Sequence, residues 1–415
     1  MSRPIGFLAL VAVLVMATAC SPPSHPATSP TPTATTVPCP GSGSGTVCTA
    51  TAAPTPEATP GPIAYVQPSA VSFIDDELGW VVGNGCDSNS TCRPAIAQTN
   101  DGGANWKLLP TPPTRVQAAG EPEWPSGAGL DFVSSKVGWL FNPFLALTIN
   151  GGQSWVNVAL PTQDPVSDVV QFDSATWVVT DCAPAASCPT TLWRSSSPGG
   201  PFHPASAQPP NLGGGNADSG QTQTSAIVSG GRLILYSPVS DLIVSTSSGQ
   251  SWARFASPCS GFDQQLGGSP GGILIDVCAA EIGGGMAPKE SWTSDDGGSH
   301  WALRSRNGGM PFTNTTVGSV PSQGYPNDIA MPTGVDAWMS MGRADVYETH
   351  DDGVTWSATP IPGQFLGNAG GAEQVVFTDR DHGWALGPEG LWRTTNGHTW
   401  MQSNILGPVT GYLPT

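Results

Sequence analysis

Charged residues are scarce in this chain of 415 residues, and positive charge is the scarcest. Lysine and arginine together number 14 against 31 aspartate and glutamate residues, and the formal net charge is −17. Binding to nucleic acid requires clustered cations that displace phosphate counterions, so this balance argues against a nucleic-acid partner. The acidic surplus favours solubility through net charge, with a basic or cationic partner as the sharper alternative.

Amphipathic helical periodicity is also missing. The chain has 52 glycines and 42 prolines, and its apolar runs are short and rich in Val, Ile and Trp. Such runs between turn residues are typical of strands, so the sequence predicts an all-β fold. Two common hydrolase signatures are absent as well, since there is no His-Glu-x-x-His and no phosphate-binding loop.

The long apolar run of the chain lies at the N-terminus. Arg3 precedes a largely apolar stretch over 5–15, which is too short to span a bilayer stably and indicates a signal peptide over 1–20. Small residues then precede Cys20, as in a bacterial lipobox, although Ala17 stands where such signals prefer Leu. Lipidation of Cys20 is favoured because this cysteine has no partner, and an ordinary signal peptide is the alternative.

A low-complexity segment follows the signal. Residues 21–61 are dominated by Pro, Thr, Ser, Ala and Gly, and Glu57 is their only charge. Such a segment cannot bury enough apolar surface to order itself, so it is expected to be a disordered linker. A lipid anchor followed by a tether predicts an extracytoplasmic protein held at the cell membrane, on a bacterial surface or in the periplasm.

The remaining eight cysteines fall into near neighbours, which predicts disulfides in an oxidising compartment. The pairs are Cys39 with Cys48, Cys86 with Cys92, Cys182 with Cys188, and Cys259 with Cys278. Metal ligation is the alternative, but no Cys-x-x-Cys pair or His cluster accompanies them. His300, His350 and His398 lie within turns or beside tryptophans, where surface placement is expected. No metal and no cofactor is therefore predicted.

One short turn recurs seven times, and its fullest form is Thr-Asn-Asp-Gly-Gly-Ala-Asn-Trp over 99–106. The closing aromatics, spaced by 44 to 55 residues, are Trp106, Trp155, Phe202, Trp252, Trp301, Trp356 and Trp400. A fixed period in this range indicates stacked repeats. Each repeat can be laid out on four antiparallel strands, and closing a ring protects the strand edges. The sequence therefore predicts a seven-bladed β-propeller over 62–412.

The composition of each turn has a physical reason. An acidic or polar side chain can accept hydrogen bonds from backbone N–H groups, a glycine supplies a conformation forbidden to other residues, and the aromatic is an apolar anchor. The clearest structural turn residues are Asp101, Gly103, Trp106, Asn150, Gly152, Trp155, Asp296, Gly298, Trp301, Asp351, Gly353 and Trp356. Thr395 takes the polar position of the last turn.

This turn is similar to the Asp-box, and the chain resembles the Asp-box (BNR) propellers shared by sialidases, sortilin-type receptors and photosystem II assembly factors. The resemblance covers about 62–412 and implies that the turns are structural and lie far from ligands. Sialidases also carry an Arg-Ile-Pro motif before the first turn and have six blades, whereas only Arg3 and Arg93 precede Asp101 here. The assembly factors bind through an arginine-rich surface that this acidic chain lacks.

Strand alternation places the Asp-box turns on one face of the disc, the turn face. The loops between strands two and three, and between successive blades, lie on the opposite face, the loop face. Three predicted disulfides and the longest connections, 110–126, 207–223 and 307–324, belong to the loop face. Its candidate partner-binding residues are Arg115, Glu121, Glu123, Trp124, Phe312 and Tyr325. Trp124 is the one tryptophan off the repeat template, and either anchors a partner or plugs the channel.

The sequence thus favours a monomeric, non-catalytic binding or scaffolding propeller that recognises a protein or glycan through the loop face. The alternative is a glycan-active enzyme, such as a sialidase-like hydrolase, or a lectin. Glu121 and Glu123 would then be the candidate acids.

Overall fold

The computed structural model describes residues 36–38, 47–49, 61–112, 128–142, 144–181, 190–212, 224–238, 240–259, 263–280, 287–307, 318–342, 345–362, 371–388 and 390–407. The chain divides into two units, Met1–Thr59 and Pro60–Thr415. In the first unit, β1 (Thr36–Pro38) and β2 (Val47–Thr49) form an antiparallel pair. Within the described ranges there is no helix of the length and apolarity that crossing a bilayer requires.

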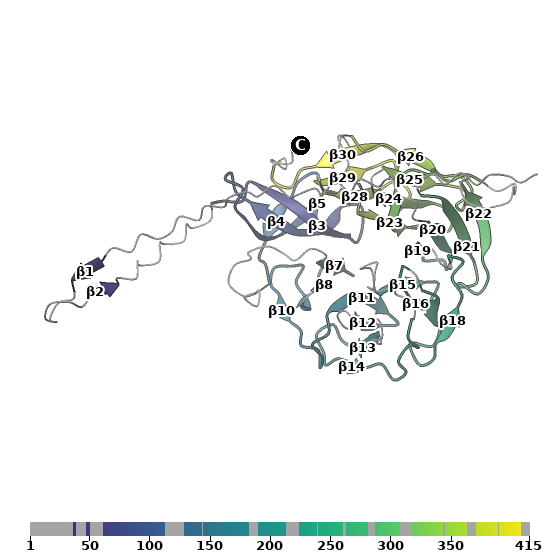
Figure 1. Cartoon of the computed structure of the whole chain (residues 1–415), viewed down its shortest axis with the longest axis horizontal. Coiled ribbons are helices and arrows are strands. Elements are labelled where there is room, and N and C mark those ends of the chain that lie inside the picture. The colour runs from purple at the N-terminus through teal and green to yellow at the C-terminus, as the bar shows by residue number, and fades with distance from the viewer. Residues whose placement is uncertain are drawn as a thin grey trace, which may run out of the picture. The chain divides into compact units, whose positions relative to one another are not determined.

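The second unit is a seven-bladed β-propeller, as the repeat predicted (Figure 1). Each blade is a four-stranded antiparallel sheet whose strands follow one another in sequence. Blade 1 contains β3 (Tyr65–Phe73), β4 (Leu78–Cys86), β5 (Cys92–Asn100) and β6 (Lys107–Leu109). Blade 2 contains β7 (Gly129–Phe132), β8 (Gly138–Phe141), β9 (Ala146–Thr148) and β10 (Val156–Asn157). Blade 3 contains β11 (Val166–Phe172), β12 (Ala175–Thr180), β13 (Thr191–Ser195) and β14 (His203–Pro204).

The other four blades repeat this order. Blade 4 contains β15 (Ser225–Ser229), β16 (Arg232–Tyr236), β17 (Leu242–Ser245) and β18 (Ala253–Phe255). Blade 5 contains β19 (Asp263–Gly268), β20 (Leu274–Ala279), β21 (Lys289–Ser294) and β22 (Ala302–Arg306). Blade 6 contains β23 (Tyr325–Ala330), β24 (Ala337–Gly342), β25 (Val346–Thr349) and β26 (Ser357–Thr359). Blade 7 contains β27 (Gln374–Phe377), β28 (Gly383–Gly387), β29 (Gly390–Thr394) and β30 (Trp400–Ser403). The first strand of each blade lies toward the centre of the ring in Figure 1.

Aromatic stacks hold neighbouring blades together. Trp80 in the second strand of blade 1 lies flat on Phe132 of blade 2, with ring centroids 3.7 Å apart. The same stack joins Trp338 to Phe377 between blades 6 and 7, at 3.9 Å. The closing tryptophan of a blade meets its own phenylalanine edge-on, as Trp155 meets Phe132 at 6.1 Å. The edge-to-face geometry is a favourable one for aromatic rings, and the parallel stacks bury large apolar faces between neighbouring sheets.

The repeated turns use the polar side chain as a backbone acceptor. Asp101 Oδ1 accepts hydrogen bonds from the backbone N–H of Asn105 at 2.8 Å and the hydroxyl of Thr99 at 2.8 Å. Gly103 has φ 89°, and a Cβ there would lie 2.9 Å from Ser403 Oγ of blade 7. Both the backbone conformation and the close approach therefore require glycine at this position.

The last turn differs from the prediction. Asn396, rather than Thr395, supplies the acceptor, because its Oδ1 receives the backbone N–H groups of His398 at 3.0 Å and Thr399 at 2.8 Å. The turn is one residue shorter than the first one, so counting back from the closing aromatic selects the wrong residue. Sequence spacing alone could not reveal where the residue was lost.

Candidate functional site

A cavity of about 560 Å³ lies among the inner strands of several blades. Its lining comes from β3, β7, β11, β15 and β27, which belong to blades 1, 2, 3, 4 and 7. Two carboxylates, Asp131 and Asp168, are part of this lining. Because the inner strands form a fixed frame around the channel, these two acids are held by regular secondary structure rather than by loops.

Irregularities in the inner strands direct two side chains toward the next blade. The register of blade 3 shifts just before Asp168, and that of blade 6 shifts just before Asp328. Asp168 then accepts the N–H of Ala226 at 2.8 Å, and Asp328 accepts the N–H of Val375 at 3.0 Å. A β-bulge commonly redirects a side chain in this way. Both aspartates therefore connect their own blade to the next one by a hydrogen bond.

Asp131 has no such role. Among the described residues, its carboxylate has no hydrogen-bond or ion-pair partner, although it lines the cavity. Burial raises the pKa of Asp131 to about 7, because removing a carboxylate from water disfavours its charged form. Burial also raises the pKa of Asp168 to about 7, and its two backbone N–H bonds oppose that shift. Among the described residues, the cavity thus contains one carboxyl without a partner, Asp131, and one that bonds the next blade, Asp168.

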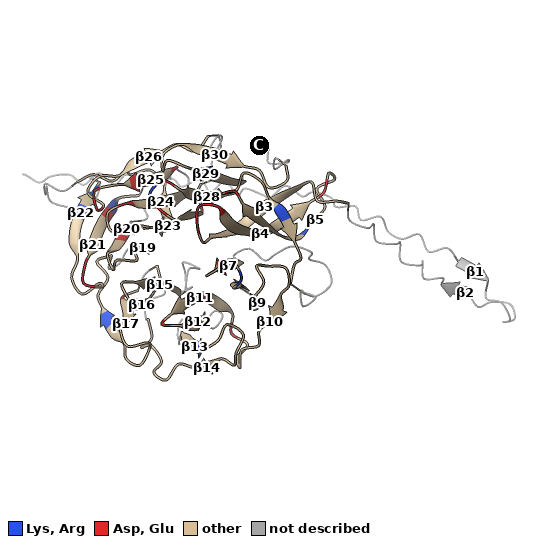
Figure 2. Cartoon of the chain, turned by 180° about the vertical axis from the view of Figure 1, so that it is seen from behind, with Lys and Arg blue, Asp and Glu red and all other residues tan. Residues whose placement is uncertain are grey.

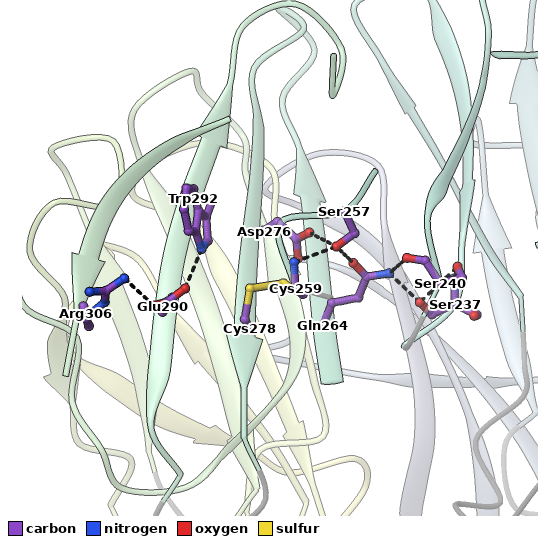
Figure 3. Close-up of a disulfide and its surroundings, with 10 residues drawn as sticks. All are labelled: Ser237, Ser240, Ser257, Cys259, Gln264, Asp276, Cys278, Glu290, Trp292 and Arg306. Atoms are coloured by element: carbon purple, nitrogen blue, oxygen red, sulfur yellow. Dashed lines mark hydrogen bonds and ion pairs between the residues drawn. A yellow bond between two sulfur atoms is a disulfide. The ribbon is translucent and has the colours of Figure 1, made fainter. Parts of the chain in front are cut away.

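The loop face is braced at blade 5 by the disulfide between Cys259 and Cys278 (Figure 3). Ser257, two residues before Cys259, donates its hydroxyl to Gln264 Oε1 at 2.5 Å. Gln264 Nε2 in turn donates to the carbonyl oxygens of Ser237 at 2.6 Å and Ser240 at 2.7 Å in the adjacent blade. The disulfide and this polar chain together fix the connection between blades 4 and 5.

Asp276 lies behind the same disulfide and is fully buried. Its Oδ2 accepts the hydroxyl of Ser257 at 3.3 Å, while its Oδ1 has no hydrogen-bond partner. Burial raises the pKa of Asp276 to about 8, so the carboxyl is mainly protonated at neutral pH. A second described disulfide, between Cys86 and Cys92, closes the hairpin of β4 and β5 on the loop face.

Several sequence predictions lie outside the described residues. These are Cys20, Cys39, Cys182, Cys188, Arg115, Glu121, Glu123, Trp124 and Phe312, together with the side chain of Cys48 in β2. Tyr325 is described, and it opens β23 as a partly buried residue at the loop face.

His350 and His398, which the sequence predicts to be separate surface residues, lie close together in the structure. His350 and His398 lie beside Glu348, and the candidate ligand atoms of the three residues are all within 4.8 Å of one another. His300 occupies the corresponding turn of blade 5 and contacts Asp296 instead. The three residues span 50 positions of sequence, so only the neighbouring placement of blades 6 and 7 brings them together.

No protein-family model and no curated protein sequence matches this chain. Solved structures do resemble it. YCF48 bound to D1 peptide is 18% identical with a TM-score of 0.52, covering 82% of this chain and 96% of that chain. YCF48 from Cyanidioschyzon merolae is 13% identical with a TM-score of 0.52, covering 81% and 97%.

An enzyme shares the architecture. The GH74 xyloglucanase from Xanthomonas campestris is 12% identical with a TM-score of 0.56, and the match covers 83% of this chain but 55% of that one. The present chain therefore corresponds to about half of that enzyme. At these identities the likenesses show the fold, a seven-bladed propeller found both in a peptide-bound protein and in a glycan-active enzyme.

Proposed function

We propose that this protein is a lipid-anchored, extracytoplasmic binding propeller that captures a cationic segment of a protein partner in its channel. The observation that carries the proposal is the carboxyl of Asp131, which lines a cavity of about 560 Å³ and has no partner among the described residues. Asp131 is partly buried, and a carboxylate partly removed from water gains by pairing with an amine or guanidinium group that enters the cavity. The site therefore selects a positively charged side chain.

The net negative charge of the whole chain also favours a positively charged ligand. The net charge is −17, and Figure 2 shows how thinly lysine and arginine are distributed over the ribbon. An acidic protein attracts a basic segment over distances of several ångströms and raises its association rate. A peptide-bound relative of the same fold, YCF48 with D1 peptide, is consistent with capture of a protein segment. A Gly-x-Ser-x-Gly occurs at 267–271, but it joins strand β19 to strand β20 rather than a strand to a helix, so a catalytic reading has less support.

The channel proposal predicts pH-dependent binding of a hexalysine peptide. Asp131 is neutral well below its pKa of about 7 and charged above it. Attraction to a cation is therefore absent at pH 5.5 and present at pH 8.5, so affinity is expected to rise by about tenfold or more across this range. Fluorescence anisotropy with a labelled peptide measures the change.

The Asp131→Asn variant should reduce this pH dependence, since the amide keeps the size of the side chain and cannot ionise. Asp168 lines the same cavity with a pKa of about 7 and should supply the pH dependence that remains. Glu77→Gln is the matched control, because Glu77 is exposed and the substitution changes the net charge equally. Equal hexalysine affinity for the native protein and Asp131→Asn, or an affinity that does not weaken with added salt, would refute the channel as the binding site. Hydrolysis of chromogenic glycosides by the purified protein would refute the non-catalytic assignment.

Membrane anchoring is a separate part of the proposal and has its own test. The signal-like segment, Cys20 and the following linker support it. Cys20→Ala is expected to move the protein from the membrane fraction to the soluble fraction, because one lipidated cysteine would supply the attachment. Fractionation followed by immunoblotting measures this distribution. A variant that remains in the membrane fraction would show that the anchor lies elsewhere.

A further inference from the structure

Glu348, His350 and His398 form a compact cluster on the turn face, where blades 6 and 7 meet. Glu348 lies in β25, His350 directly follows that strand, and His398 lies in the turn between β29 and β30. The distance from Glu348 Oε1 to His398 Nδ1 is 2.7 Å, and Glu348 Oε2 lies 3.5 Å from His350 Nε2. The cluster thus combines two imidazoles with one carboxylate, a ligand set that suits zinc.

The carboxylate is unusually placed for a residue with no bound cation. The Glu348 side chain is only 9% exposed, and its buried Oε2 makes no hydrogen bond. The two histidine side chains are more open, at 32% and 54% exposed. Oε2 has only the long contact of 3.5 Å with His350 Nε2, so an ion bound between this oxygen and the imidazoles would satisfy it better.

A second carboxylate fixes the orientation of His350. Its Nδ1 lies 2.7 Å from Asp336 Oδ1, and its Nε2 lies 3.5 Å from Glu348 Oε2. In the tautomer that donates through Nδ1, Nε2 carries the lone pair that a metal ion would take. This is the carboxylate–histidine arrangement that supports metal-ligating histidines. Trp338 packs edge-on against the His350 ring with centroids 5.5 Å apart, which further limits its rotation.

The turn of blade 7 places His398 with similar rigidity. Its backbone N–H donates to Asn396 Oδ1 at 3.0 Å. The neighbouring Gly397 carbonyl accepts the Trp338 Nε1–H from blade 6 at 3.1 Å. The two histidine rings have their centroids 5.5 Å apart. Elements of both blades therefore hold the ligands in place before any ion arrives.

We propose that Glu348, His350 and His398 bind one divalent transition-metal ion of the zinc class. Ligand atoms in a tetrahedral site with bonds of roughly 2.0–2.1 Å are separated by roughly 3.3 Å. His398 Nδ1 lies 2.7 Å from Glu348 Oε1, and His350 Nε2 lies 3.5 Å from Glu348 Oε2. One ligand atom from each residue can be chosen so that all three lie within 4.8 Å of one another, so side-chain rotations complete the site. Three protein ligands leave a fourth position for water or for a group from a partner. This site lies on the face opposite the disulfides and is independent of the channel.

The test is titration of the purified, untagged and EDTA-treated chain with Zn²⁺ by calorimetry, and with Co²⁺ by visible absorption. One ion per chain is expected, at micromolar affinity or tighter, with the intense bands of four-coordinate Co²⁺. His398→Gln should weaken Zn²⁺ binding at least 100-fold. The matched control is His300→Gln, since His300 lies in the equivalent turn of blade 5 beside a single aspartate and should have no effect.

Asp336→Asn separates a metal site from a simple hydrogen-bonded cluster. Asp336 does not belong to the ligand set, but it orients His350, and loss of such a partner typically lowers metal affinity by 10–100-fold. Circular dichroism spectra that match the native protein would verify that each variant is folded. Failure of the native chain to bind Zn²⁺, or equal affinities for the native chain and folded His398→Gln, would overturn the proposal.

Discussion

Replacement of Trp384 by alanine is expected to lower the free energy of unfolding by ~3–5 kcal/mol. Trp384 is 1% exposed and stacks on Phe73 with ring centroids 3.5 Å apart and planes 9° from parallel. Its Nε1–H also donates to the Gly102 carbonyl at 3.0 Å. The substitution therefore creates a large cavity and leaves a buried carbonyl without its donor. Urea denaturation monitored by tryptophan fluorescence measures the loss.

This tryptophan lies at the seam where the ring closes. Each sheet consists of consecutive strands, so no strand is exchanged between blade 7 and blade 1. Side chains hold the seam instead, since Gln374 bonds both the N–H and the carbonyl of Val71, and Trp106 donates to Ser403. The backbone N–H of Val66 adds one bond to the Ile405 carbonyl at 3.1 Å. The seam therefore depends on the Trp384 stack more than a covalently connected interface would.

Trp80→Ala is the matched control for that dependence. Trp80 makes the same stack and the same kind of hydrogen bond, to Gly151 at 3.1 Å, but the polypeptide continues directly from blade 1 to blade 2. Hydrogen exchange in β3 and β27 should increase more in Trp384→Ala than in Trp80→Ala. A loss below about 1 kcal/mol in Trp384→Ala would contradict the seam argument.

The sequence predicted the seven blades because the turns recur at nearly constant spacing. It did not predict which residues the second-strand tryptophans Trp80 and Trp384 touch. Phe73 and Phe132 become their partners only when successive sheets stack with a particular offset. That offset is a property of the assembled ring, so no local pattern encodes it.

The candidate sites were less predictable than the fold for a related reason. The long loops were the predicted location of the binding site, whereas Asp131 lies in the short inner strand β7, where its alternating burial resembles that of any other strand. A register shift directs the Asp168 side chain toward the next blade, and the sequence of the strand does not indicate this shift. Glu348 and His398 meet through packing of separate blades, and neither carries a recognisable motif around it.

Lys289 at the start of β21 is the second position where a large effect is expected. This lysine is 1% exposed, and its Nζ lies 3.0–3.2 Å from the carbonyl oxygens of Ala287, Pro321, Ser322 and Gln323. Three of these carbonyls belong to the connection between blades 5 and 6 that leads to Tyr325. The ammonium group therefore anchors this loop-face connection to blade 5.

Lys289→Met should destabilise the protein by about 3 kcal/mol, because the apolar side chain fills the space but leaves buried carbonyls without their donor. Lys136→Met is the control, since Lys136 is exposed and the charge change is equal. Urea denaturation measures both variants. Hydrogen exchange over 318–324 should increase in Lys289→Met alone.

The stability difference between the native protein and Lys289→Met should also depend on pH. Burial lowers the pKa of Lys289 to about 7, below its ordinary value of 10.5 in the unfolded chain. Between these values the unfolded chain binds more protons than the folded one, so the native protein gains stability as pH rises from 7 to about 10. The Met variant lacks this gain, and the difference widens. A difference that stays constant across this range would mean that the four carbonyl oxygens keep the amine charged in the folded protein.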